Sequence, residues 1–246
     1  FIDKYSQKII KNVNKLKTRP PYLYEIGNEN PNPISLVINI SDWHIGKLVI
    51  GVEILGEANY NIEIFENRVQ KYLEKIVRYI EKLNPEKVYI LNYGDGADDP
   101  TALTYPDQIE HQDLKHEEQL VRYVNELEKF ILQIYDYQPH IEYKGVKGNH
   151  SPEGLNIDRV ANMLLAKRLE DYDTIKVNNE DKKYKITEIY DYYLIQTHGD
   201  NLKKRTETPT AVTQALSIAN MEELPAKHTY IVQGHLHHRS SEGPSY

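Results

Sequence analysis

Side chains of the types that bind metal ions gather in five short segments of the sequence. Histidine, aspartate and asparagine are concentrated in Asp42-Trp43-His44, Gly94-Asp95-Gly96-Ala97-Asp98, Gly148-Asn149-His150, His198-Gly199-Asp200 and Gly234-His235-Leu236-His237. Imidazole, carboxylate and amide oxygen are ligands for divalent manganese, iron, zinc and nickel. The chain has no cysteine, which excludes thiolate nucleophiles, disulfides and sulfur-based zinc or iron–sulfur sites. The pattern therefore indicates a metal centre with nitrogen and oxygen donors.

Each segment directly follows an apolar, β-rich run, so a strand is expected to position it. The predicted strands cover 34–40, 87–93, 141–146, 192–197 and 228–234. Helical periodicity at 61–83, 110–136, 155–170 and 207–222 alternates with these strands, which predicts an α/β fold. Shorter β-like runs at 173–178 and 183–190 predict an antiparallel portion that spans 173–197. Because open α/β sheets bind ligands at the carboxyl ends of their strands, all five segments should meet at one rim.

The charges of such a centre favour an anionic substrate. Two divalent ions more than offset Asp42, Asp95 and a bridging hydroxide, which leaves about one positive charge to attract a phosphate group. Two ions about 3.5–4 Å apart can hold the phosphate and acidify a bound water together. The charge balance thus favours a site that attracts phosphate and can activate a bound water. The chain has no GxSxG elbow and no P-loop. The sequence therefore does not support acyl hydrolysis by a serine nucleophile or binding of a nucleoside triphosphate by a P-loop.

The order DxH, GDxxD, GNH, His-Gly and GHxH resembles the calcineurin-like metallophosphoesterase superfamily over about residues 34–240. The resemblance implies an α/β/β/α arrangement, in which two mixed β-sheets pack as a sandwich flanked by helices. It also implies two divalent ions, with manganese favoured and iron, zinc, nickel or magnesium as alternatives. The THGD segment at 197–200 is similar to nuclease-like and phage-type members.

Carried over residue by residue, the resemblance implies two ligand sets that share one carboxylate. One ion would be bound by Asp42, His44, Asp95 and His237, and the other by Asp95, Asn149, His198 and His235. Asp95 and His150 are the implied catalytic residues: Asp95 bridges the ions, and His150 stabilises or protonates the leaving oxygen. The superfamily usually has an acidic residue after GNH, whereas this chain has Ser151, which favours an electrostatic role for His150.

Two domains are expected. Residues 1–33 form a basic amphipathic helix and a proline-containing linker, and six basic residues stand against one aspartate within 1–19. This helix is interpreted as a brace on the catalytic body, the tail of a missing domain, or an arm for a partner protein or nucleic acid. Residues 34–246 form the catalytic domain, which is either truncated at its carboxyl end or has a small second sheet. The start at Phe1 leads us to expect a missing leading segment.

Three function classes follow, and the first is preferred. The chain is expected to be a metal-dependent phosphodiesterase or nuclease acting on DNA, RNA or a nucleotide, with a phosphomonoesterase as the alternative and a non-catalytic scaffold third. The basic first helix and Lys203-Lys204-Arg205 favour diesters, whereas the net charge of −7 argues against nonspecific binding of long nucleic acid. No apolar run is long enough to cross a bilayer, so a cytoplasmic protein without membrane contact is expected.

Ordinary explanations compete with these assignments. Asp95 and Asp98 could form a turn, Asn149 could cap a helix, and His235 and His237 could be exposed turn residues. Trp43, the single tryptophan, is interpreted as a packing residue beside the site, with a base-stacking platform as the alternative. The remaining histidines are interpreted as rim, surface or packing residues: His111, His116, His140, His228 and His238.

Overall fold

A computed structural model describes residues 33–51, 59–99, 106–151, 156–200, 217–224 and 228–235. The helix expected within 1–19, the basic run at 203–205 and the proposed ligand His237 lie outside these ranges. Within them, no helix combines the length and the apolar character needed to span a bilayer.

A four-stranded parallel sheet forms the centre of the fold. Its strands follow the chain in the order β1 (Ser35–Ile40), β2 (Lys87–Asn92), β3 (Ile141–Gly145) and β4 (Ile175–Asn178). In β2 every residue after Lys87 is buried, as expected for a parallel strand that is covered on both faces. The predicted α/β class is confirmed.

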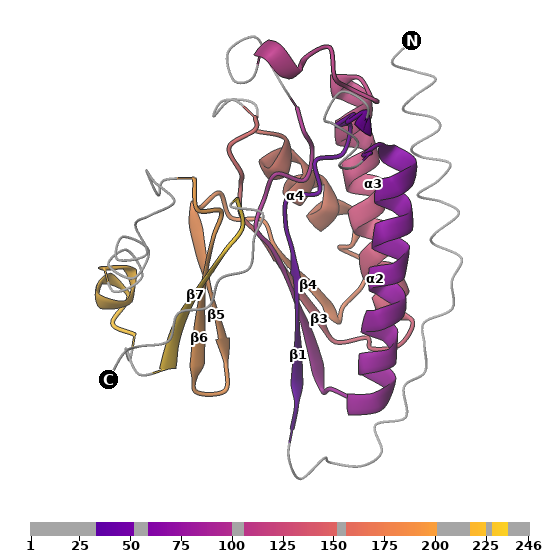
Figure 1. Ribbon diagram of the computed structural model, residues 1–246. Helices are drawn as coiled ribbons and strands as arrows, with labels where there is room; N and C mark the ends of the chain where they lie inside the picture. Colours follow the sequence, from indigo (N-terminus) through magenta and orange to yellow (C-terminus); the bar gives the residue numbers. More distant parts are fainter. Residues whose placement is uncertain are drawn as a thin grey trace.

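Three helices pack beside this sheet, with α2 and α3 against one of its faces (Figure 1): α2 (Ile62–Leu83), α3 (His116–Tyr135) and α4 (Ile157–Arg168). The Asn61 side chain caps α2 by accepting the N–H of Ile64, and α2 ends at Asn84 in the left-handed conformation. The helix predicted at 110–136 begins only at His116, because a short 3₁₀ turn, η2 (Pro106–Gln108), and further turns occupy the preceding residues.

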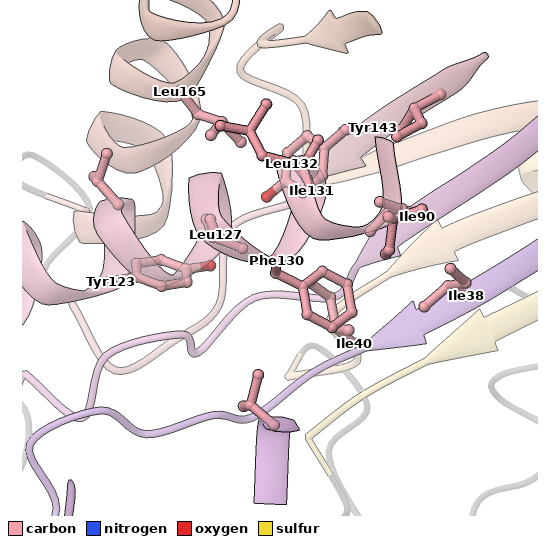
Figure 2. Packing of buried hydrophobic residues seen from close by; sticks show 14 of the residues in the cluster. Ile38, Ile40, Ile90, Tyr123, Leu127, Phe130, Ile131, Leu132, Tyr143 and Leu165 are labelled. Carbon is pink, nitrogen blue, oxygen red and sulfur yellow. The ribbon is translucent and has the colours of Figure 1, made fainter. Parts of the chain in front are cut away.

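The main hydrophobic core lies between the sheet and these helices. Figure 2 shows Leu127 and Phe130 of α3 facing the sheet residues Ile38, Ile40 and Ile90. Burying a side chain of this size contributes about 1.5–3 kcal/mol, so this face of α3 fixes the helix on the sheet. The sheet in turn supplies a rigid edge for the loops that follow its strands.

A second sheet has three strands, β5 (Tyr184–Ile189), β6 (Tyr192–Thr197) and β7 (Thr229–Gln233). It lies on the side of the parallel sheet opposite α2 and α3 (Figure 1), and the buried Gln196 side chain donates a hydrogen bond across to the carbonyl of Lys144. The prediction of an antiparallel portion from 173 is wrong for β4, which pairs parallel with β3 because α4 forms the crossover between them. Among the strands that the structure describes, only β5 and β6 pair antiparallel, and β7 pairs parallel with β6.

Candidate metal centre

The loops after five strands meet at one rim, as the sequence predicted. The Asp42 and His44 amides, after β1, donate to the carbonyls of Gly94 and Asp95, after β2, over 3.0 Å each. The His150 amide, after β3, donates to Asp95 Oδ1 over 3.0 Å, and the His235 amide, after β7, donates to Asp42 Oδ2 over 3.1 Å. Segments distant in the sequence are therefore joined by hydrogen bonds from main-chain amides to carbonyl or carboxylate oxygens.

Two groups of three ligand-type side chains form within this rim. One contains His44, Asp95 and His150, and the other contains Asp95, His198 and His235. In each group the ligand atoms lie within 4.8 Å of one another. Asp95 belongs to both groups and is only 2% exposed, so one buried carboxylate lies between two sets of imidazoles.

Contacts of Nδ1 with oxygen atoms orient three of these imidazoles, and in His198 and His150 the contact is a hydrogen bond. His198 Nδ1 lies 2.7 Å from the carbonyl oxygen of Tyr93, and His150 Nδ1 lies 2.6 Å from that of Asp98. A carbonyl can only accept, so both Nδ1 atoms carry hydrogen. His44 Nδ1 lies 3.1 Å from a carboxylate oxygen of Asp98. Metal-binding histidines are held in this way, with one ring nitrogen bonded to oxygen and the other available to the ion.

The His198 ring faces two oxygen atoms through its other nitrogen. His198 Nε2 lies 3.0 Å from Asp95 Oδ2 and 2.8 Å from Asn149 Oδ1. Burial lowers the pKa of His198, but the hydrogen bond and charge of Asp95 outweigh it and raise the pKa to about 9. Burial likewise raises the pKa of Asp95, and the His198 contact reverses this and lowers it. These contacts favour a proton on His198 Nε2, which metal binding would displace, since a metal ion displaces protons from its ligands.

The other two imidazoles with a shifted pKa favour the neutral form that a metal requires. Burial lowers the pKa of His150, and burial together with the neighbouring His198 lowers the pKa of His235. Neutral rings offer a lone pair to a cation.

The backbone at the rim is strained where the ligand-type residues lie. Asp42, His44, Asp95 and His235 have positive φ angles of 51°, 44°, 51° and 66°. Such conformations cost of order 1–3 kcal/mol each for non-glycine residues and persist where the surrounding structure enforces them. Four of the seven proposed ligands adopt this conformation, and so do four other non-glycine residues of the described chain, among them Asn84 at the end of α2.

Asp98 links two histidines of the rim. It is fully buried, and its carboxylate accepts a hydrogen bond from Gln112 at 2.8 Å and lies 3.6 Å from Lys47 Nζ. Burial raises the pKa of Asp98, but the contacts with His44 and Lys47 outweigh it and lower the pKa. A charged Asp98 therefore orients His44 through its side chain and His150 through its carbonyl.

Asp158, in the first turn of α4, joins two of the ligand-bearing loops and was not identified in the sequence. Its carboxylate accepts the amide N–H groups of Asp95, Gly96 and Gly148 at 3.0, 3.0 and 2.9 Å. Burial and the charge of Asp95 raise the pKa of Asp158, whereas the hydrogen bonds from the amides of Gly148 and Gly96 lower it; the net shift is upward. Acidic residues are common in a first helical turn, so the sequence offered no signal that separates Asp158 from a residue that complements the helix dipole.

The structure brings six of the seven proposed ligands to this rim, namely Asp42, His44, Asp95, Asn149, His198 and His235. The placement differs from the expectation in two respects. His150 joins His44 and Asp95 as a donor, whereas Asp42, whose Oδ1 lies 3.9 Å from His44 Nε2, belongs to neither group of three. Ser151, which follows the GNH segment, bonds through its hydroxyl to Asp99 and accepts the Ile157 amide, so it supports the start of α4.

The composition of this rim fits divalent metal ions. Imidazole nitrogen and carboxylate and amide oxygen suit manganese, iron, zinc or nickel, and a carboxylate common to both groups could bridge two ions.

Trp43 is half-buried and packs edge-to-face against Phe65 and Phe130, with ring centroids 5.3 and 5.8 Å apart, as a packing residue beside the site would.

Comparison with known proteins adds a distant relative from a prophage. The chain is 23% identical over 247 residues to the SPbeta prophage-derived uncharacterized protein YonJ of Bacillus subtilis (strain 168), in an alignment that covers 94% of this chain and 56% of that protein. The chain thus spans about half the length of the curated relative it matches. No protein-family model matches the chain.

Proposed function

We propose that this chain is a dinuclear metal-dependent phosphodiesterase that cleaves nucleic-acid or nucleotide diesters. In this proposal the two sheets and their helices form the α/β/β/α sandwich of the calcineurin-like metallophosphoesterases. The observation that carries the proposal is the position of Asp95, which belongs to both groups of donors and is almost fully buried. A single carboxylate between two imidazole sets could bridge a pair of ions.

Two bound divalent cations would supply charge that neutralises a phosphate and favours ionisation of water near neutral pH. The residues of the chain provide the frame. Asp95 would be shared, while Asn149, His198 and His235 would complete one side, and Asp42, His44 and His237 the other. Asp98 and Asp158 keep this frame in place, because one orients His44 and the other binds the amides of the Asp95 and Gly148 loops.

His150 takes part through its Nε2 atom. Its Nδ1–H is committed to the Asp98 carbonyl, and Nε2 lies 3.8 Å from Asp95 Oδ2. Burial lowers the pKa of His150, which favours the neutral ring with Nε2 as an acceptor. To protonate a leaving oxygen, His150 must first acquire a second proton, which the negative charge of a bound phosphate would favour. Its place beside Asp95 supports a role at the reacting phosphate.

The test compares three substrates in the presence of Mn²⁺: bis-p-nitrophenyl phosphate, p-nitrophenyl phosphate and single-stranded DNA. We expect hydrolysis of the diester and of DNA to exceed that of the monoester, and we expect Asp95→Asn to abolish both hydrolysis and binding of two ions. Asp173→Asn, which changes an exposed aspartate, is the matched control and should behave as the parent chain. Faster hydrolysis of the monoester would show that the chain is a phosphomonoesterase and not a diesterase. Absence of both metal and activity would refute the proposal.

A further inference from the structure

A pocket of about 440 Å³ opens directly beside the candidate metal centre. Asp42 and His44 form part of its wall, so the pocket and the ligand-type residues share side chains. The volume lies within the range of about 300–1,000 Å³ that is typical of small-molecule sites. A group bound there would adjoin whatever is held at the metal centre.

The rest of the wall combines aromatic rings with positive charge. Trp43, Tyr60 and Tyr72 contribute rings, and Lys47 and Arg68 contribute cations. The Arg68 guanidinium carbon lies 5.3 Å from the centroid of the Tyr60 ring, so the cation is held against an aromatic face. Among the described residues, no carboxylate is ion-paired with Arg68, in contrast to Lys47, which lies 3.6 Å from Asp98.

This combination matches the two parts of a nucleotide. Aromatic faces and guanidinium planes stack on bases with little preference for sequence, and a guanidinium binds phosphate oxygens through paired hydrogen bonds. The Tyr60 hydroxyl already bonds to the Trp43 carbonyl, so Tyr60 offers its ring rather than its hydroxyl.

We propose that this pocket binds the nucleotide unit next to the scissile phosphate, with its base against the aromatic wall and its own phosphate at Arg68. The inference rests on the proposed function, because it assigns a substrate class to the same site. It makes Arg68, on α2, the residue that binds the phosphate of this nucleotide unit, while the aromatic wall distinguishes nucleotides from phosphate esters without a base.

Trp43 provides a direct measurement of binding, because it is the single tryptophan of the chain and lines the pocket. Its fluorescence is followed while thymidine 5′-monophosphate, deoxyribose 5-phosphate or inorganic phosphate is added to the protein in EDTA. We expect the fluorescence titrations to show that the nucleotide binds at least tenfold more tightly than the two compounds without a base. Arg68→Ala should weaken nucleotide binding about tenfold or more. Arg78→Ala, an exposed arginine of the same helix outside the pocket, is the control and should leave binding unchanged.

Hydrolysis assays separate this inference from the proposed function. With Mn²⁺, Arg68→Ala should raise KM for thymidine 5′-phosphate 3′-(p-nitrophenyl phosphate), which carries a second phosphate beside the scissile one, and leave bis-p-nitrophenyl phosphate, which has neither a base nor a second phosphate, nearly unaffected. Equal binding of nucleotide and inorganic phosphate, or an Arg68→Ala protein that binds like Arg78→Ala, would overturn the pocket assignment even if hydrolysis is observed. Arg68-dependent nucleotide binding without any hydrolysis would support the pocket and refute the diesterase.

Discussion

Replacement of Asp158 by asparagine tests whether one buried carboxylate holds the ligand-bearing loops together. Asp158 Oδ2 accepts the amides of Asp95 and Gly148, and Oδ1 accepts that of Gly96. Asparagine has almost the same shape but only one acceptor oxygen, so at least one amide loses its partner or faces the NH₂ group. The variant therefore changes hydrogen bonding without creating a cavity.

The magnitude follows from those three bonds. An unsatisfied buried donor costs about 1–3 kcal/mol, and a hydrogen bond to a charged acceptor is worth about 1.5–3 kcal/mol. The cost of burying the Asp158 charge, which is visible in its raised pKa, offsets part of this loss. We expect a decrease of about 2–4 kcal/mol in the free energy of unfolding, measured by urea denaturation. Since Asp95 and Gly148 then lose their anchor, Mn²⁺ affinity should fall about 10–100-fold in titration calorimetry.

The result is compared with Asp173→Asn, an exposed site that should change neither quantity. A destabilised Asp158→Asn protein with unaltered Mn²⁺ affinity would show that Asp158 supports α4 alone and not the metal centre. Unaltered stability and affinity together would refute the reasoning from the three amide bonds.

Three further variants test other parts of the structure. His150→Ala should retain two Mn²⁺ ions per chain by elemental analysis and lower turnover about 10²–10⁴-fold; loss of one ion would make His150 a ligand. Gly148→Ala should reduce metal content, because a Cβ there would overlap Asp95 Oδ1. Burial lowers the pKa of Lys185 from 10.5 to about 8, so between these values only the unfolded chain keeps the proton and stability should rise with pH. In urea titrations from pH 7 to 10, Lys185→Met should be more stable at pH 7 and should lack this rise.

Much of the α/β fold could be predicted, because its strands are short apolar runs and its helices are long and periodic. The positions of the ligand-type residues also followed from the sequence, since each stands directly after a strand. The pairing of β4 could not be read from its four residues, because neither sheet membership nor direction is encoded in so short a run. Asp158 was missed for a similar reason: its partners are main-chain amides, which leave no mark in the sequence.

The donors around Asp95 belong to two different sheets. Asp95 follows β2 of the parallel sheet, whereas His198 and His235 follow β6 and β7 of the three-stranded one. An ion bound by these three residues would act as a cross-link between layers that are also joined by the Gln196 side chain. Chelation should then loosen the smaller layer first, so that its amide hydrogens exchange with solvent sooner while those of β2 and β3 stay protected.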